Sequence, residues 1–435
     1  MRIPGPEARG DGGVSAVSEA GGLHLYQLRL HEQYGPVVQF ELPGAGLAVS
    51  VADPVLLEGV ASIDKRPEEL FAFLAPLCED RNLQVLETGE HTRWRRLLLD
   101  VLAGRPSHER HFGEFVALAG ELADQWEREL GSGPVALQKG LASLSLRMIC
   151  AFALGGANSG LVDAERVVDA FEVVLGEHLG RGPQGATERA EDALRYLRAT
   201  VDRVIASRQN GARSDKSDLI GALVEAGERP ARIRDTVMVT MLAAHHTTGV
   251  AVSWALYLLG RHPDVAERVG DELDRALGGR ELPEYRDLRQ LTYLDMVLKE
   301  SMRLYPPGPY GARETTEVVV LGEYEVPAGV TVFCPFWAVH MNPEHWPEPS
   351  KFDPERFSPE EVAERHRLAH VPFGFGPRSC EGASLATVEA MLVLAVLLKR
   401  FRFRPVPEHD VVPVERFVLW AEEDILMNLS LRGHQ

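Results

Sequence analysis

The sequence predicts a mainly α-helical protein in which a small β-rich region accompanies one large helical domain. Three observations lead to this prediction. Apolar residues recur at a spacing of three to four from about residue 53 to 300, as they do in amphipathic helices. The stretch Ala231–Gly260 contains no proline and predicts one helix of about 45 Å. Short segments of strand-like alternation fall at about 36–52, 316–335 and 401–433.

The individual elements follow from local signals along the chain. Residues 1–35 form a glycine-rich lead that ends in a short helix near 21–34, and residues 36–435 form the single domain. Val37–Leu42 and Gly46–Val51 flank a Pro-Gly-Ala turn and predict a β-hairpin. Later signals predict a helix ending at Tyr305, strands at Val318–Leu321 and Thr331–Cys334, and an apolar helix at Ala383–Arg400.

Composition excludes several classes of protein. The chain has 46 Lys and Arg against 64 Asp and Glu, a net charge of −18, which argues against nucleic acid as the main partner. Its four cysteines are too sparse for a disulfide framework. The start lacks the apolar core of a signal peptide, and the apolar runs at 249–260 and 389–398 are too short to span a bilayer. We therefore expect a cytoplasmic monomer without a membrane anchor.

A loop that opens the helix at Ala383 carries an unusual cysteine. In Phe373-Gly-Phe-Gly-Pro-Arg-Ser-Cys380-Glu-Gly382, the helix N-terminus stabilises a thiolate at Cys380. Gly376 and Gly382 permit the backbone to approach closely beside the sulfur. This arrangement suits the presentation of one thiolate to a flat metal cofactor. The alternative is a lone buried cysteine, the commoner fate of a free thiol.

Four motifs in order along the chain make it resemble the bacterial soluble members of the cytochrome P450 haem-thiolate monooxygenases. The cysteine loop matches F-x-x-G-x-R-x-C-x-G, and Glu300 to Arg303 matches E-x-x-R. Arg356 lies in a P-E-R-F element, and His91 to Arg95 matches H-x-x-x-R. The resemblance covers residues 36–433. It implies the fold of that family, a triangular helical prism with haem between the long central helix and the helix after the cysteine.

The resemblance also implies a set of cofactor-binding residues. Cys380 would be the axial ligand of the iron in haem b, and arginine can pair with a carboxylate through two hydrogen bonds. The candidates for the haem propionates are His91, Arg95, Arg313 and Arg378, and the loop residues Phe373, Gly376 and Gly382 complete the haem-binding motif. Glu300, Arg303 and Arg356 would form a structural triad that supports this loop. The alternative for these three residues is a surface ion pair that contributes little to stability.

The middle of the long helix departs from the family pattern A/G-G-x-D/E-T-T/S. It reads Ala243-Ala-His-His-Thr-Thr248, so Thr247 takes the threonine position, where its hydroxyl would bond O2 or water. His246 replaces the usual acid and could relay protons near neutral pH. The same His-His-Thr run is found in sterol 14α-demethylases. The alternative for both histidines is that they are satisfied polar residues in a kinked helix. Glu381, directly after the cysteine, also departs from the apolar residue common in the family.

The substrate predicted by family position is an apolar small molecule, such as a terpenoid, steroid or polyketide intermediate, free or tethered to a carrier. Packing in the core is the alternative for the aromatic residues involved. The candidate pocket residues are Phe71, Phe73 and Leu74 in a lid segment, Ala243 and Ala244 on the long helix, Tyr310 with a hydroxyl to orient the substrate, and Trp420 in the tail.

No G-x-G-x-x-G unit follows a predicted strand, so electrons are expected to come from a ferredoxin and its ferredoxin reductase. Such donors are acidic, and a basic patch is expected to receive them. Its candidate members are Arg93, Arg96, Arg378, Lys399 and Arg400. The predicted activity is O2-dependent oxidation. Three alternatives stay open: coupling, desaturation or rearrangement without oxygen insertion, non-enzymatic haem binding, and sterol demethylation.

Overall fold

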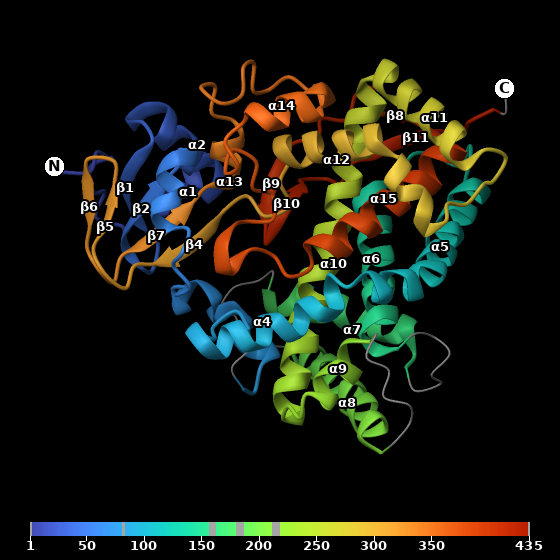
Figure 1. The fold of residues 1–435 in the computed structure, drawn as a ribbon, viewed down its shortest axis with the longest axis horizontal. Helices are drawn as coiled ribbons and strands as arrows, with labels where there is room; N and C mark the ends of the chain where they lie inside the picture. The colour runs from blue at the N-terminus through green and yellow to red at the C-terminus, as the bar shows by residue number, and fades with distance from the viewer. Residues whose placement is uncertain (1, 81–82, 156–161, 180–186, 211–217, 434–435) are drawn as a thin grey trace. The chain divides into compact units, whose positions relative to one another are not determined.

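The computed structural model describes residues 2–80, 83–155, 162–179, 187–210 and 218–433 (Figure 1). It is mainly α-helical with small β-sheets, which confirms the predicted fold class. The chain forms two compact units. The first contains residues 1–70, 295–380 and 410–423, and the second contains residues 71–294, 381–409 and 424–435.

The first unit is built on a four-stranded sheet with the order β1-β2-β7-β4. β1 (Val37–Leu42) and β2 (Gly46–Val51) form the predicted hairpin, with Val37 opposite Val51. β2 runs parallel to β7 (Thr331–Cys334), and β7 runs antiparallel to β4 (Gly311–Glu314). Figure 1 shows the helices α1 (Val14–Ala20) and α2 (Leu23–Tyr34) beside this sheet, so the predicted short helix is confirmed and a second one precedes it.

The remaining elements of the first unit are short helices and strands. Two hairpins, β5–β6 and β9–β10, lie outside the sheet. The bounds are α3 Pro54–Leu57, η1 Glu58–Val60, β5 Val319–Leu321, β6 Tyr324–Val326, α13 Phe336–His340, η6 Pro354–Phe357, α14 Pro359–Glu364, η7 Gly376–Arg378, β9 Pro413–Arg416 and β10 Val418–Ala421. The segment η2 (Glu68–Leu77) and the helix α12 (Thr292–Leu304) each run from one unit into the other.

The second unit is almost entirely helical. Its helices are α4 Thr88–Leu102, α5 Arg105–Arg128, α6 Leu137–Leu154, α7 Ala164–Val174, α8 Glu188–Gln209, α9 Leu219–Glu225, α10 Pro230–Arg261, α11 Pro263–Leu277 and α15 Ala383–Arg400, with a π-helical turn at Leu175–Leu179 and a 3-10 turn, η5, at Tyr285–Gln290. The observed α15 has the predicted bounds. A three-stranded antiparallel sheet, β3 (Val135–Ala136), β11 (Leu426–Leu431) and β8 (Phe401–Pro405), completes the unit.

Helix α10, predicted over Ala231–Gly260, extends from Pro230 to Arg261 and packs most extensively on α6. Gly249 permits this close crossing. A Cβ atom at Gly249 would lie 2.7 Å from the carbonyl carbon of Leu141 in α6, which is shorter than real contacts. The glycine therefore permits the close spacing of α6 and α10.

The sequence reading of apolar runs overlooked α6. Leu137–Leu154 is long and apolar enough to cross a membrane by length and composition. However, 78% of it is buried inside the protein, as in the core helix of a globular unit. Its contacts with α10 and α5 account for that composition.

Candidate functional site

Cys380 lies at the end of a tight loop in the first unit. Its backbone N–H donates to the carbonyl oxygen of Phe373 at 2.8 Å, which closes the loop. Within the loop, Gly376 has a φ of +66°, and a Cβ there would come 2.0 Å from the carbonyl oxygen of Ala61. Only glycine fits that position, so the motif residues Phe373 and Gly376 shape the turn that presents the cysteine. Gly382 caps the start of α15.

Exposure separates Cys380 from the other three cysteines. Cys150 and Cys334 are buried, Cys78 is half-buried, and Cys380 alone is exposed. Burial raises the pKa of Cys150 to about 12 and that of Cys334 to about 11, so both stay protonated thiols. Because a metal ligand must be an accessible thiolate, Cys380 is the cysteine that suits the role.

Arg313, on β4 of the first unit, is a buried cation that could bind a carboxylate. It is 3% exposed, and it donates to the carbonyl oxygens of Ala312 and Phe375, each at 3.0 Å. Its Nε has no hydrogen-bond partner, and no carboxylate pairs with it among the residues that the structure describes. Burial lowers the pKa of its guanidinium, because the charge lacks solvation. A haem propionate would supply the anion that this buried cation lacks, so the residues fit the cofactor implied by the motifs.

Arg378, the loop arginine, already has an acidic partner. Its Nε lies 2.8 Å from Oδ1 of Asp64, and the side chain of Arg66 donates to its backbone carbonyl at 3.3 Å. The guanidinium is almost fully buried, so water screens this ion pair little. A propionate on Arg378 would therefore share the guanidinium with Asp64, whereas Asp64 attracts Arg313 without forming an ion pair with it.

The H-x-x-x-R motif lies on α4 in the second unit. His91 and Arg95 are one turn apart on one face of α4, and His91 is 1% exposed. Trp94, on the same helix, is fully buried and packs in the core. Arg95 forms an ion pair with Glu381, the residue that follows Cys380.

The structure brings Glu300, Arg303 and Arg356 together in the first unit. Arg303 binds both oxygens of Glu300, at 2.7 and 2.8 Å, and Nε of Arg356 lies 3.6 Å from Glu300. Arg303 and Glu300 are fully buried, so the surface ion pair considered above does not describe them. Arg303 also donates to the carbonyl oxygens of His340, Pro349 and Lys351, and Glu300 accepts from the N–H of Asp353. The triad therefore ties α12 to the segment that leads to the cysteine loop.

The two faces of α10 differ in the region of the His-His-Thr run. Ala243, Ala244 and Thr247 lie on a face that is exposed or half-buried, whereas His245 and Thr248 are buried. The hydroxyl of Thr247 donates to the carbonyl oxygen of Ala243 at 2.8 Å, which leaves the oxygen as an acceptor. The predicted oxygen-binding residues are therefore on the accessible face of the helix.

Both histidines in this run are neutral at physiological pH. Burial lowers the pKa of His246 to about 4. Burial, with repulsion from His246, lowers that of His245 to about 2. Their rings are stacked, with centroids 4.0 Å apart. A neutral imidazole can pass a proton along, but it holds no extra proton to give at neutral pH.

The sequence analysis missed a buried acid on α15. Glu389 is 2% exposed, one carboxylate oxygen lies 3.4 Å from the Thr248 hydroxyl, and the other has no partner. Burial raises the pKa of Glu389 to about 8, with Thr248 opposing the shift. The signal was present in the sequence, because Glu389 is the single acid inside the apolar helix 383–398. Glu389 is therefore a neutral carboxylic acid in the core at neutral pH.

We expect Glu389→Gln to change how stability depends on pH. The carboxyl group loses its proton near pH 4.5 in the unfolded protein, but only near pH 8 in the folded protein. Wild-type stability therefore falls as the pH rises through that window. The unfolding free energy of the variant, relative to that of the wild type, should therefore rise by about 2–3 kcal/mol between about pH 5 and about pH 7.5, since each pH unit in this window changes it by about 1.4 kcal/mol. Urea unfolding at both pH values measures this gain. The exposed Glu121→Gln should show no such trend, and an equal trend in both variants would refute the raised pKa.

The predicted substrate residues fall into two groups. In the second unit, η2 carries Phe71, half-buried, Phe73, 37% exposed, and Leu74, buried. Leu74 therefore packs in the core, which was the alternative for this segment, and Phe73 is the accessible aromatic. The segment is held by Arg198 of α8, which donates to the carbonyl oxygen of Pro76 at 2.9 Å.

In the first unit, Tyr310 lies against the tail hairpin β9–β10. Its hydroxyl donates to Glu415, and the carboxyl of Glu415 also binds Nδ1 of His24 at 2.9 Å. The hydroxyl is thus engaged inside the protein, which argues against its orienting a substrate. Trp420 is half-buried on β10, and the tip of the hairpin is Phe417, 44% exposed with a φ of +68°. Phe417 is an accessible aromatic that the sequence analysis did not select.

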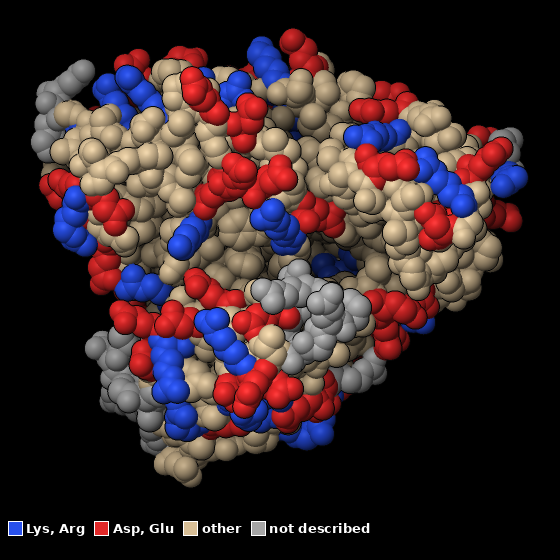
Figure 2. Space-filling view, turned by 180° about the vertical axis from the view of Figure 1, so that it is seen from behind, with Lys and Arg blue, Asp and Glu red and all other residues tan. Residues whose placement is uncertain are grey.

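The expected basic patch is largely neutralised by acids within each unit. Arg93 pairs with Glu228, and Lys399 with Asp274 at 2.6 Å. Arg400 pairs with Asp124 and Glu127, and Arg378 with Asp64, so of the five candidates Arg96 is the exposed cation with no acidic partner among the described residues. Figure 2 shows the same interspersion, with acidic and basic side chains mixed across one face. These residues do not form an all-basic patch.

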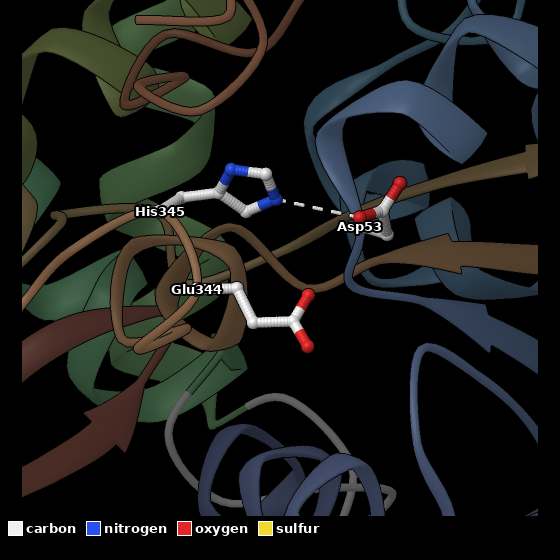
Figure 3. A group of neighbouring side chains, drawn as sticks. All are labelled: Asp53, Glu344 and His345. Carbon is white, nitrogen blue, oxygen red and sulfur yellow. Dashed lines mark hydrogen bonds and ion pairs between the residues drawn. The ribbon is translucent and has the colours of Figure 1, made fainter.

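One further cluster of metal-binding residue types occurs in the first unit. Ligand atoms of Asp53, Glu344 and His345 all lie within 4.8 Å of one another, and Figure 3 shows the imidazole directed at Asp53. Asp53 and His345 have structural contacts already. Asp53 caps α3 through the N–H of Leu56 at 2.9 Å, and Nε2 of His345 lies 3.4 Å from its other oxygen. None of the three is fully buried, so we assign the cluster to joining α3 to the segment after α13.

Comparison with known proteins places these features in a family. The family model "Cytochrome P450" matches residues 13–429. "Cyclooctatin synthase" of Streptomyces melanosporofaciens is 36% identical over 250 residues, 56% of this chain and 54% of that protein. "Cyclooctat-9-en-7-ol 5-monooxygenase" of the same organism is 37% identical over 232 residues, 52% of this chain and 50% of that protein. "Cytochrome P450 4c21" of Blattella germanica is 28% identical over 426 residues, 87% of this chain and 82% of that protein.

The alignments with the two Streptomyces enzymes span about half of each protein's length. The family match, by contrast, covers nearly the whole of this chain, including all four motifs. Members of that family bind haem through a cysteine thiolate as the axial ligand of the iron. The chain belongs to the cytochrome P450 family of haem-thiolate monooxygenases.

Proposed function

We propose that this protein uses a haem held by Cys380 to activate O2 and oxidise an apolar small molecule. Two features of the same unit carry the proposal. One is a single exposed cysteine in a glycine-shaped turn, and the other is the buried cation Arg313, which forms no ion pair among the described residues. Cys380 would bind the iron and Arg313 a propionate. The bound haem supplies the oxygen chemistry, and the chain supplies position, protons and exclusion of water.

The proposed substrate is a terpenoid or another apolar intermediate. Two relatives are named for cyclooctatin chemistry, and the name of one describes a monooxygenase of an unsaturated alcohol, which supports this class. The accessible aromatic side chain of Phe417, in the same unit as Cys380, would bury apolar surface of such a ligand. Tyr310 is left out of the proposed contacts because its hydroxyl is bound by Glu415.

A spin-state titration of the purified ferric holoenzyme tests this proposal. The panel contains terpenoids, sterols, macrolactones and aromatic amides. A substrate that displaces water from the iron shifts the absorption to the high-spin form, and we expect this shift with terpenoids. A shift with aromatic amides alone would contradict the proposed class. A haem-loaded protein that responds to no compound in the panel would contradict an untethered apolar substrate of these classes.

Thr247 and His246 are proposed to handle protons during oxygen activation. The Thr247 hydroxyl is on the accessible face of α10, and the neutral imidazole of His246 can relay a proton through its two nitrogens. We expect Thr247→Ala to lower the ratio of product formed to reductant consumed severalfold. Thr240→Ala is the matched control, because Thr240 makes the same bond to the carbonyl four residues earlier, at 2.8 Å. Equal ratios in both variants would remove Thr247 from this role.

A second candidate function is oxidation without net oxygen insertion, such as desaturation or coupling. It is favoured by the absence of an acid from Ala243–Thr248 on α10, since neutral histidines supply protons less readily than an acid does. A product that has lost hydrogen and gained no oxygen would support it.

A ferredoxin with its reductase is the proposed electron donor, tested by whether that pair reduces the ferric protein. The cytoplasmic location, the lack of a membrane anchor and the monomeric state stay predictions.

A further inference from the structure

Glu381 is held in a contact that the sequence motifs do not describe. It directly follows Cys380 and precedes α15. Its carboxylate forms an ion pair with Arg95, which comes from α4, 286 residues earlier in the chain. Each of the two side chains is 16% exposed, so the pair is largely withdrawn from solvent. Both residues belong to the second unit.

The position of this carboxylate gives it an electrostatic effect on a metal held by Cys380. Reduction of ferric to ferrous iron adds one electron, and a nearby negative charge opposes that addition. Water screens a carboxylate at an exposed position, but it screens one that is 16% exposed much less. The guanidinium of Arg95 opposes the same field, so the net effect depends on how closely the pair is held. Hydrogen bonding and charge around a ligating cysteine are known means of tuning an iron centre.

We propose that the Glu381–Arg95 ion pair sets the reduction potential of the iron bound by Cys380. Glu381 lowers the potential, and Arg95 limits how far it is lowered. The electron comes from the external donor of the proposed function, and no proton is required in this step. Glu381 is therefore a tuning residue that acts through charge beside the ligand. The inference rests on Cys380 being the haem ligand.

The pair also constrains Arg95 itself. The motif resemblance assigns Arg95 to a haem propionate, yet its guanidinium already binds a carboxylate from its own chain. Arg313 has no such partner among the described residues. For this reason the test changes Glu381 and leaves Arg95 in place, since an Arg95 variant would alter the cofactor contact together with the ion pair.

The test measures the midpoint potential of the ferric–ferrous couple by spectroelectrochemistry of the holoenzyme. In Glu381→Gln the side chain keeps its size and loses its charge, and we expect the midpoint to shift to a more positive value. In Glu381→Asp the charge stays while the shorter side chain loses contact with Arg95, and we expect a shift to a more negative value. Glu121→Gln is the control, because it removes one charge from an exposed pair with Arg147 in the same unit.

Two results would overturn the inference. One is a Glu381→Gln shift no larger than that of Glu121→Gln, and the other is a shift of the same sign in Glu381→Gln and Glu381→Asp. The reduced CO spectrum of each protein separates these results from a failure of the proposed function. A wild-type protein without the thiolate-type spectrum would refute the ligand assignment and, with it, this inference. A thiolate-type spectrum without the selective shift would refute this inference alone.

Discussion

Replacing Cys380 by serine is expected to abolish the thiolate-type absorption of the reduced CO complex completely. A serine hydroxyl does not replace the thiolate that gives this family its spectrum and its reactivity with oxygen. The other three cysteines are poor substitutes, because Cys150 and Cys334 are buried thiols with raised pKa values. The half-buried Cys78 is the matched control, and Cys78→Ser should keep the spectrum of the wild type.

The measurement is the CO difference spectrum after reduction, recorded for both serine variants at equal haem content. Loss of the thiolate-type band in Cys380→Ser alone would establish the ligand. Persistence of that band in Cys380→Ser would show that another residue ligates the iron, and the proposed site would then be wrong. Circular dichroism of each variant checks that the helices are intact.

Replacing Glu300 by alanine is expected to cost roughly 3–5 kcal/mol of unfolding free energy, the range for breaking a buried ion pair. The substitution leaves Arg303 fully buried with its charge uncompensated, and it removes the acceptor for the N–H of Asp353. Glu300→Gln should cost less, because the amide oxygen still accepts hydrogen bonds. Burial raises the pKa of Glu300 above its unfolded value, so its protonated form favours the folded state, and we expect wild-type stability to fall as the pH rises above the unfolded pKa.

Urea unfolding of the haem-free and haem-loaded protein measures the loss. The control is Glu121→Ala, which breaks an exposed pair with Arg147 and should change stability by less than about 1 kcal/mol. A Glu300→Ala variant as stable as that control would contradict a supporting role for the triad. A loss of stability with an unchanged thiolate-type spectrum in the folded fraction is the result expected of a structural group.

Elements with strong local signals were predictable from the sequence. The hairpin strands Val37–Leu42 and Gly46–Val51 and the helix Ala383–Arg400 have the predicted bounds. In each case a run of apolar residues ends at a turn residue or at a change of period, so the backbone preference and the pattern agree. The cysteine loop was predictable from its glycine-containing motif, and one of its glycines, Gly376, sits where a side chain would clash with Ala61.

Contacts between residues distant in sequence were not predictable. The loop arginine Arg378 pairs with Asp64, 314 positions away, and Arg95 pairs with Glu381. Spacing along a helix does not reveal which acid a distant arginine will meet, since that depends on how the elements pack. The Tyr310 hydroxyl was assigned to substrate for the same reason, and its bond to Glu415 became visible only with the hairpin in place.

The most direct test of the central claim is the mass of the product formed under 18O2. The holoenzyme receives electrons from a ferredoxin and its reductase, with the compound that shifts its spin state as the substrate. The account predicts a product that has gained one oxygen atom, and that this atom is 18O. A product that has lost hydrogen without gaining 18O, or reductant consumption with no product from any compound that shifts the spin state, would contradict it.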